Sequence, residues 1–262
     1  MATNHNHTNG DVATSAKPVF FFDIDNCLYS KSEDPLSYDS LLAWLADFSV
    51  GRRVHDRMAR LIDQFFQTHL NLPEEEAIRL HREYYKNYGL AIEGLVRHHQ
   101  IDPLEYNSKV DDALVLEDVI TPDPELRSLL EDIDKSKVTM WLFTNAHINH
   151  GKRVVKLLGV DDLFDGLTYC DYSQPRLVCK PSREMYEKGM REAGVSRVED
   201  CYFVDDSYLN CCKAAEFGWS VVHLVEEGTP IPEKPACNCQ IQTLQELRDV
   251  YPQFFKSKNP PA

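Results

Sequence analysis

The chain lacks any long apolar run. No stretch of its 262 residues approaches the ~20 consecutive apolar residues that a membrane-spanning helix needs, and its first residues lack the basic start and apolar centre of a signal peptide. Positive charge is also scarce, because 28 Lys and Arg face 42 Asp and Glu, a formal net charge of −14. These shortages argue against a membrane protein and against nucleic acids or anionic membranes as general partners. They predict an intracellular protein, in the cytoplasm, with the nucleus as an additional location.

A disulfide framework is missing as well. The eight cysteines do not follow the regular spacing of a small secreted domain and lie mostly in apolar surroundings, so we predict reduced thiols. Cys237 and Cys239 are separated by one residue, whereas zinc ligands are usually about two to four residues apart. Cys27 has no histidine nearby in the sequence to activate it as a nucleophile. It is therefore predicted to pack beneath a loop.

The most informative stretch is residues 19–29, VFFFDIDNCLY. An apolar run leads directly into Asp23 and Asp25, which predicts a buried parallel strand with two carboxylates at its carboxyl end. Ligands bind at this edge of open α/β sheets. Two crowded carboxylates repel each other unless a cation lies between them or one keeps its proton. The pair therefore predicts a metal, a proton-transfer role, or both, with a simple turn cap as the alternative.

The rest of the chain predicts an α/β protein with a helical insertion. Buried strands are predicted near residues 18–23, 138–143, 201–207 and 220–225, separated by helical segments, which is typical of a parallel sheet. Between about residues 39 and 116 the apolar residues instead recur at helical spacing, and no strand-like run interrupts them. One predicted helix face consists of Met58, Leu61, Ile62, Phe65 and Phe66. The predicted fold is a Rossmann-like parallel sheet core with an all-helical cap inserted after the first strand.

The predicted boundaries follow from this pattern. They are a disordered tail over 1–17, an α/β core over 18–30 and 118–255, a helical cap over 31–117, and a second tail over 256–262. The histidines of the cap and its YYKNYG cluster could face a pocket, although each is by default part of a core or of a solvated helix face. Asn87 and Tyr88 of that cluster are the candidate contacts to a substrate.

Polar residues follow three of the predicted strands, and a lysine arrives from a loop. They are Asp23, Asp25, Thr144, Asn145, Asp205, Asp206 and Lys180. The carboxyl ends of parallel strands meet at one edge of a sheet, so these side chains are predicted to converge. A carboxylate can attack phosphorus when its own charge and that of the phosphate are both offset. The set therefore suits phosphoryl transfer through an acyl phosphate.

Four motifs occur in order, DIDNC, FTN, CKP and VDDS. On these motifs the chain resembles the haloacid dehalogenase superfamily over about residues 18–251. FFDIDNCLY, LFTNA and FVDDSYLNCCKA further resemble the fungal and plant pyrimidine 5′-nucleotidase branch, whose yeast member hydrolyses UMP and CMP. Most superfamily members have Gly and then Thr or Val after the second aspartate, where this chain has Asn26 and Cys27. This departure leaves the reacting groups intact and matches the nucleotidase branch.

The resemblance implies a role for each acidic residue. Asp23 would be the nucleophile that forms an aspartyl-phosphate. Asp25 would protonate the leaving oxygen and then deprotonate the attacking water, with a pKa raised by the neighbouring carboxylates. Mg²⁺ would bind Asp23, the backbone carbonyl of Asp25 and a carboxylate of the last motif. We favour Asp206 as the direct ligand, with Asp205 behind it or acting through water.

The resemblance also implies roles for the remaining polar residues. Lys180 would pair with the phosphate and with Asp23, which offsets negative charge during transfer. The hydroxyl of Thr144 and the backbone amides of Thr144 and Asn145 would hold the phosphate oxygens. Taken alone, Lys180 would be a surface lysine and Thr144-Asn145 a turn. Their order and their positions at strand ends favour the functional interpretation.

The predicted function is a Mg²⁺-dependent phosphomonoesterase, and its substrate is predicted to be a nucleoside 5′-monophosphate, preferably UMP or CMP. Alternatives are another small phosphate, such as lysophosphatidic acid, a sugar phosphate, pyridoxal phosphate or nicotinamide mononucleotide. A phosphotransferase or mutase, and a binding module without catalysis, also fit the fold. The sequence does not indicate whether the protein is a monomer or an oligomer.

Overall fold

The computed structural model describes residues 17–30 and 54–257. Both predicted tails, apart from residues 17, 256 and 257, lie outside these ranges. The first part of the predicted cap, residues 31–53, lies outside them too, together with the helix predicted from residue 39. In the described ranges, no helix combines the length and the apolar character needed to cross a membrane.

Six strands in the described part of the chain form one parallel sheet, in the order β3-β2-β1-β4-β5-β6. Their bounds are β1 Val19–Phe22, β2 Thr139–Phe143, β3 Gly166–Thr168, β4 Cys201–Asp205, β5 Ser220–Leu224 and β6 Cys239–Ile241. The central strand β1 lies between β2 and β4, and Phe22 is in register with both Leu142 and Val204. The three central strands therefore end side by side. The α/β fold class and the parallel sheet are confirmed.

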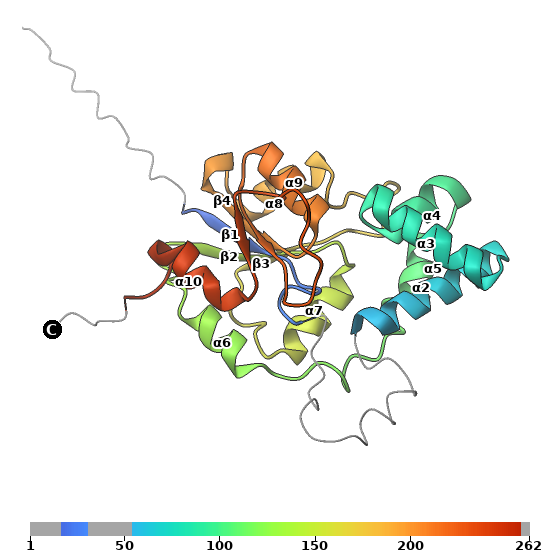
Figure 1. The fold of residues 1–262 in the computed structure, drawn as a ribbon, viewed down its shortest axis with the longest axis horizontal. Coiled ribbons are helices and arrows are strands. Elements are labelled where there is room, and N and C mark those ends of the chain that lie inside the picture. Colours follow the sequence, from blue (N-terminus) through green and yellow to red (C-terminus); the bar gives the residue numbers. More distant parts are fainter. Residues whose placement is uncertain (1–16, 31–53, 258–262) are drawn as a thin grey trace, which may run out of the picture.

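Helices cover both faces of the sheet (Figure 1). On one side lie α8 (Arg183–Ala193) and α9 (Tyr208–Phe217); on the other lie α6 (Pro124–Glu131), α7 (Ile148–Leu157) and the short α10 (Leu247–Val250). Successive side chains of a strand point to opposite faces. Accordingly, Phe20 and Phe22 pack in the core beneath α6, α7 and α10, whereas Val19 and Phe21 pack beneath α8 and α9. This two-sided burial explains the uninterrupted apolar run of β1.

In residues 54–109, which follow the undescribed segment after β1, four helices lie together at one end of the sheet (Figure 1). They are α2 (Val54–Leu70), α3 (Glu74–Tyr88), α4 (Ala91–His99) and α5 (Pro103–Lys109). Phe65 and Phe66 of α2 are buried in a core shared by these helices, against which Met58, Leu61 and Ile62 also pack. That core extends to Cys170 and Cys179 of the α/β region. The helices are those expected of a cap, and the exact domain boundaries stay a prediction.

Two strands were not predicted from the sequence. Both β3 and β6 contain three residues, and their sequences, GLT and CQI, carry no apolar run. Each lies at an edge of the sheet, where pairing with a single neighbour is enough to form it. The predicted closing helix is also shorter than its pattern suggests, since α10 has one turn and follows a 3₁₀ turn over Leu244–Glu246. Long-range backbone pairing decides these elements, and local sequence does not record it.

The eight cysteines are all free thiols in the structure. Cys27 is buried, and its Sγ lies 3.8 Å from the carbonyl oxygen of Val204. Burial and the nearby carboxylates raise the pKa of this thiol above its ordinary value. Cys27 therefore packs beneath the loop that follows β1, as predicted, and is not activated as a nucleophile.

Candidate active site

A cavity of about 560 Å³ lies between the carboxyl edge of the sheet and helices α2 and α3. Six of the seven predicted site residues line it: Asp23, Asp25, Thr144, Asn145, Lys180 and Asp206. The seventh, Asp205, is fully buried and does not line the cavity. The opposite wall comes from the cap helices, with His55, Met58 and Ile62 on α2 and with Arg82 and Tyr85 on α3. Segments remote in sequence thus surround one space.

Lys180 is the central group of the site. Its side chain is 1% exposed, and its Nζ donates hydrogen bonds of 2.7 Å to Asp23 Oδ1, to Asp205 Oδ2 and to the carbonyl oxygen of Phe143. An ammonium has three N–H donors, so each one has an acceptor here. Burial alone would lower the pKa of Lys180, but the charges of Asp205 and Asp23 raise it above its ordinary value. The side chain is therefore a fixed positive charge beside Asp23.

Three carboxylates lie close enough to share a cation. Ligand oxygens of Asp23, Asp205 and Asp206 all lie within 4.8 Å of one another. Burial and repulsion from Asp205 and Asp206 raise the pKa of Asp23 well above its ordinary value, although Lys180 acts in the opposite direction. The single positive charge of Lys180 therefore does not balance the negative charge of the three carboxylates. Carboxylate oxygens are the ligands that hard divalent cations prefer, so these residues fit a Mg²⁺ site.

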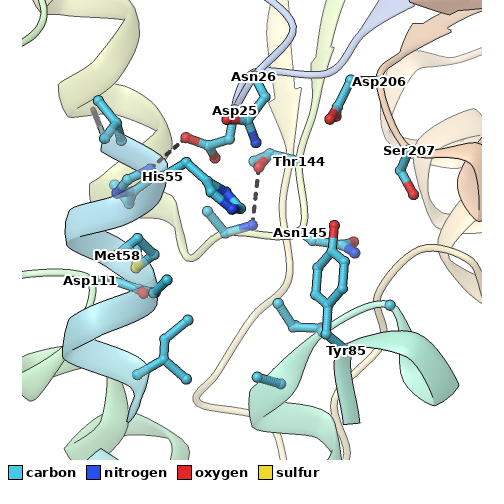
Figure 2. Close-up of a pocket in the computed structure, with 18 of the residues that line it drawn as sticks. Asp25, Asn26, His55, Met58, Tyr85, Asp111, Thr144, Asn145, Asp206 and Ser207 are labelled. Atoms are coloured by element: carbon cyan, nitrogen blue, oxygen red, sulfur yellow. Dashed lines mark hydrogen bonds and ion pairs between the residues drawn. The ribbon is translucent and has the colours of Figure 1, made fainter. Parts of the chain in front are cut away.

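The two aspartates that end β4 have different surroundings. Asp205 accepts hydrogen bonds from Lys180, from the backbone N–H of Ser207 at 2.7 Å and from the side-chain amide of Asn210 at 3.1 Å. Asp206 faces the cavity (Figure 2). The oxygens of Asp205 are thus committed to protein donors. This difference supports Asp206 as the direct ligand of a metal, an assignment that stays a prediction.

Asp25 is held by two residues that the sequence analysis missed. Its Oδ1 accepts hydrogen bonds from the hydroxyl of Tyr29 at 2.7 Å and from Nε2 of His150 at 2.8 Å. Burial alone would raise the pKa of Asp25, but the charge of His150 and these two hydrogen bonds lower it below its ordinary value. The prediction of a raised pKa was therefore wrong for the free protein, because the interactions with His150 and Tyr29 outweigh the effect of burial.

His150 lies on α7, close behind the FTN motif, and is buried. Burial would lower the pKa of this imidazole, but the charge of Asp25 and its hydrogen bond raise it to about 9. His150 is thus protonated at neutral pH and forms an ion pair with Asp25. The two residues are 125 positions apart. The position of His150 behind the motif was visible in the sequence, but its partner was not.

The FTN segment uses several of its groups for structure. The backbone N–H of Thr144 donates to the carbonyl oxygen of Thr168, so the prediction that this amide holds a phosphate was wrong. Thr144 Oγ1 accepts from the N–H of Ala146 at 3.0 Å, which leaves its own O–H to donate into the cavity. The side chain of Asn145 bonds both backbone groups of Lys180, accepting from its N–H at 2.6 Å and donating to its carbonyl at 2.8 Å. Asn145 therefore fixes the loop that carries Lys180.

Asn26 explains the departure from glycine after the second aspartate. Its φ is 60°, in the left-handed region that non-glycine residues seldom adopt. Asparagine tolerates this region better than most side chains. The chain can therefore turn away from the end of β1 here without a glycine, and Asp23 and Asp25 keep their places at the cavity.

The cap contributes a tyrosine that differs from the predicted one. Figure 2 shows Tyr85 rising from α3 with its hydroxyl toward Asn145, across the cavity from Met58 on α2. Tyr85 is 54% exposed as a whole, but desolvation of its hydroxyl and the neighbouring carboxylates raise its pKa, so the hydroxyl stays a donor. Asn87 and Tyr88 do not line the cavity, and the hydroxyl of Tyr88 is instead 2.7 Å from Nε2 of His98. Tyr85 and Tyr88 are three residues apart and therefore lie on the same side of the helix. The sequence alone did not show which of the two reaches the cavity.

Comparisons with known proteins agree with this geometry. The family model of haloacid dehalogenase-like hydrolases matches residues 17–215. Phosphate metabolism protein 8 of Saccharomyces cerevisiae is 39% identical over 221 residues, which cover 81% of this chain and 63% of that protein. The chain thus spans less than two thirds of the length of this relative.

Solved structures share the fold at low sequence identity. A HAD phosphatase from Thermococcus onnurineus has a TM-score of 0.54 and 18% identity, over 89% of this chain and 97% of that one. The HAD-type protein YfnB from Bacillus subtilis, in a form bound to magnesium, has a TM-score of 0.52 and 14% identity, over 89% and 98% of the two chains. These likenesses extend to nearly the full length of both structures, and they concern the fold.

Proposed function

The chain belongs to the haloacid dehalogenase-like hydrolases, and we propose that it is a phosphomonoesterase that acts on a small phosphorylated metabolite through an aspartyl-phosphate. The observation that carries this proposal is the position of Lys180, whose Nζ lies 2.7 Å from Asp23 Oδ1 at the wall of the cavity. A carboxylate attacks a phosphate anion only when positive charge offsets both partners. Lys180 supplies that charge in a fixed place.

The first step uses the second oxygen of Asp23. Because Oδ1 of Asp23 accepts from Lys180, Oδ2 is the oxygen that attacks phosphorus. The new bond joins Oδ2 to phosphorus while the bond from phosphorus to the leaving oxygen breaks, with the two oxygens in line. The Thr144 hydroxyl and the Lys180 ammonium stabilise charge on the transferring group. The product of this step is the phosphorylated Asp23 and an alcohol.

Asp25 manages the proton in both steps. It lines the same cavity as Asp23, two residues further along the chain. In the free protein Asp25 is ionised, but the negative charge of a bound phosphate would raise its pKa and let it carry the proton that the leaving oxygen needs. It then takes a proton from the water that hydrolyses phosphorylated Asp23. The proton on Asp25 is thereby restored.

Mg²⁺ would be held by Asp23, Asp206 and the backbone carbonyl of Asp25. The close approach of the carboxylates and the raised pKa of Asp23 support this assignment, and the magnesium-bound form of a protein with the same fold is consistent with it. When bound, the ion would neutralise charge on the phosphate and on Asp23. Asp205, bonded to Lys180, would act behind these ligands.

The proposed substrate is a nucleoside 5′-monophosphate, with UMP and CMP preferred over purine nucleotides. We propose that the cap, residues 31–117, selects the leaving group, since the core residues of the site would bind the phosphate and its reacting oxygens. A cavity of about 560 Å³ with Tyr85 and Met58 on opposite sides has room for a small planar group beside the phosphate site. Aromatic rings and thioethers both pack well against such a group.

The test is a phosphate-release assay with and without Mg²⁺. An aryl phosphate, UMP, CMP, AMP and GMP are compared, with Asp23→Asn as the inactive control. We expect Mg²⁺-dependent release from the aryl phosphate and faster turnover of UMP and CMP. Equal turnover of all four nucleotides would reject the pyrimidine preference and leave the phosphatase standing. A wild-type protein inert toward every substrate would overturn the proposed function.

A further inference from the structure

The hydrogen-bond partner of His150 in the described residues is Asp25. The side chain of His150 is 1% exposed, and Nε2 lies 2.8 Å from Asp25 Oδ1. The other ring nitrogen, Nδ1, has no hydrogen-bond partner among the described residues. Burying an imidazole is unfavourable unless its polar atoms are bonded. An apolar side chain would fill the same space without the cost of burying polar atoms. The hydrogen bond to Asp25 therefore indicates a role for His150 beyond packing.

Within residues 17–30 and 54–257, the hydrogen bonds that the side chain of Asp25 accepts fall on a single oxygen. Both the hydroxyl of Tyr29, at 2.7 Å, and Nε2 of His150 approach Oδ1. They come from different elements, Tyr29 from the loop after β1 and His150 from α7. Two donors that approach the same oxygen from separate directions restrict rotation of the carboxylate about its Cβ–Cγ bond. Oδ2 of Asp25 is left as the oxygen that can exchange a proton with a substrate.

The backbone around His150 has little freedom to move. A Cβ added to the next residue, Gly151, would lie 3.2 Å from Cδ1 of Ile24 and 3.5 Å from Cγ2 of Thr144. Helix α7 therefore packs closely against both strand ends that form the site. Ile24 lies between the two reactive aspartates in the sequence. The distance from α7 to Asp25 is fixed by this packing, which suits a residue that positions another.

Resting on the proposed function, we propose that His150 is a positioning residue that, together with Tyr29, holds Asp25 with Oδ2 toward the leaving oxygen of the substrate. His150 touches neither the phosphate nor the reacting atoms in this arrangement. Its contribution is limited to the proton transfer that Asp25 performs. Interactions that orient a general acid matter most when the leaving group needs a proton.

This limitation gives the proposal a distinctive consequence. The sugar alcohol of UMP is a poor leaving group unless it is protonated as it departs. The para-nitrophenolate of para-nitrophenyl phosphate is stable as an anion and needs little protonation. Loss of the His150 donor should therefore lower kcat/KM for UMP by about 10- to 100-fold, a part of the ~10²–10⁴ that general acid catalysis contributes. The fall for para-nitrophenyl phosphate should be several-fold smaller.

The experiment compares two variants at the same position with both substrates. His150→Leu removes the donor and keeps an apolar side chain of similar size, whereas His150→Gln places an amide N–H near the position of Nε2. We measure kcat/KM with Mg²⁺, because this ratio reports the steps up to departure of the leaving group. We expect His150→Leu to lose activity selectively toward UMP and His150→Gln to recover most of it. Tyr29→Phe, which removes the second donor, should show a smaller loss with the same selectivity.

Three results would decide against His150 as a positioning residue. The first is an equal fall of kcat/KM for both substrates in His150→Leu, which indicates a structural role. The second is no recovery in His150→Gln. The third result matters if His150→Leu does not fold. In that case the inference is overturned if Tyr29→Phe and His150→Gln lose activity equally toward both substrates. A wild-type protein inert toward both substrates would instead refute the proposed function itself.

Discussion

Removal of the Lys180 ammonium is the perturbation whose effect the structure defines best. Lys180→Met keeps a side chain of similar length but leaves Asp23 and Asp205 facing each other without the cation that joins them. The end of the side chain already lies beside two aromatic rings, since the ring centroids of Phe143 and Phe203 are each 5.3 Å from Nζ. Methionine should therefore fit the space. The loss is then electrostatic, and it concerns residues that are nearly fully buried.

The magnitude follows from this burial. Removing one partner of a buried ion pair usually costs about 3–5 kcal/mol, because the remaining charge is left uncompensated. For a chain of this size each kcal/mol lowers Tm by roughly 2–4 °C. We therefore expect Lys180→Met to unfold about 6–20 °C below wild type at neutral pH. EDTA is included so that a bound divalent cation does not take over the role of the ammonium.

Lys188 offers a matched control on helix α8. Its Nζ also donates to a carbonyl oxygen, that of Tyr169 at 2.8 Å, and pairs with one carboxylate, Glu192 at 3.3 Å. This pair is partly exposed, so Lys188→Met should cost less than about 1 kcal/mol. In the double variant Lys180→Met/Asp205→Asn one of the stranded charges is absent, and part of the lost Tm should return. Equal unfolding of Lys180→Met and Lys188→Met would refute this account of the site.

Three further predictions concern catalysis, the metal and the cap. Asp23→Asn should lower phosphate release by about 10³-fold or more. In EDTA it should raise Tm, because it removes a buried charge while its amide oxygen can still accept a hydrogen bond from Lys180. A lower Tm would contradict this. Mg²⁺ should raise the Tm of wild type in a concentration-dependent way, and Asp206→Asn should weaken this shift; an undiminished shift would place the ion elsewhere. Tyr85→Ala should raise KM for UMP by about 10-fold, which corresponds to the loss of one ring contact of ~1.4 kcal/mol. Tyr88→Ala should change this KM less than twofold. A larger effect of Tyr88→Ala than of Tyr85→Ala would contradict the observed orientation of α3.

The sheet and most of the site could be predicted from the sequence because both depend on local patterns. The apolar run of β1 is buried on both faces, so it needs no alternation and stands out in the sequence. The parallel register then aligns the carboxyl ends of the central strands, since Phe22 pairs with both Leu142 and Val204. Polar residues that follow each strand therefore meet without any further information. This is why Asp23 and Asp206, which follow β1 and β4, line the same cavity.

The features that were missed depend on distant contacts. The bond between His150 and Asp25 joins positions 125 apart, and the direction of the Asp25 pKa shift follows from it. The N–H of Thr144 looked available for a phosphate, but pairing of β2 with the unpredicted β3 region uses it for Thr168. The orientation of α3, which turns Tyr85 and not Tyr88 to the cavity, is set by packing within the cap. Side-chain partners and helix rotation are decided by tertiary structure.

The proposal that Asp23 becomes phosphorylated is tested most directly by rapid acid quenching of the enzyme during turnover, followed by mass spectrometry of its peptides. With Mg²⁺ and an aryl phosphate present, we predict that the peptide containing residues 19–29 gains the mass of one phosphoryl group. This gain should be removed by hydroxylamine, which cleaves acyl phosphates, and should be absent from Asp23→Asn. An enzyme that turns over substrate with no phosphorylated peptide, or with the group on a residue other than Asp23, would contradict the mechanism.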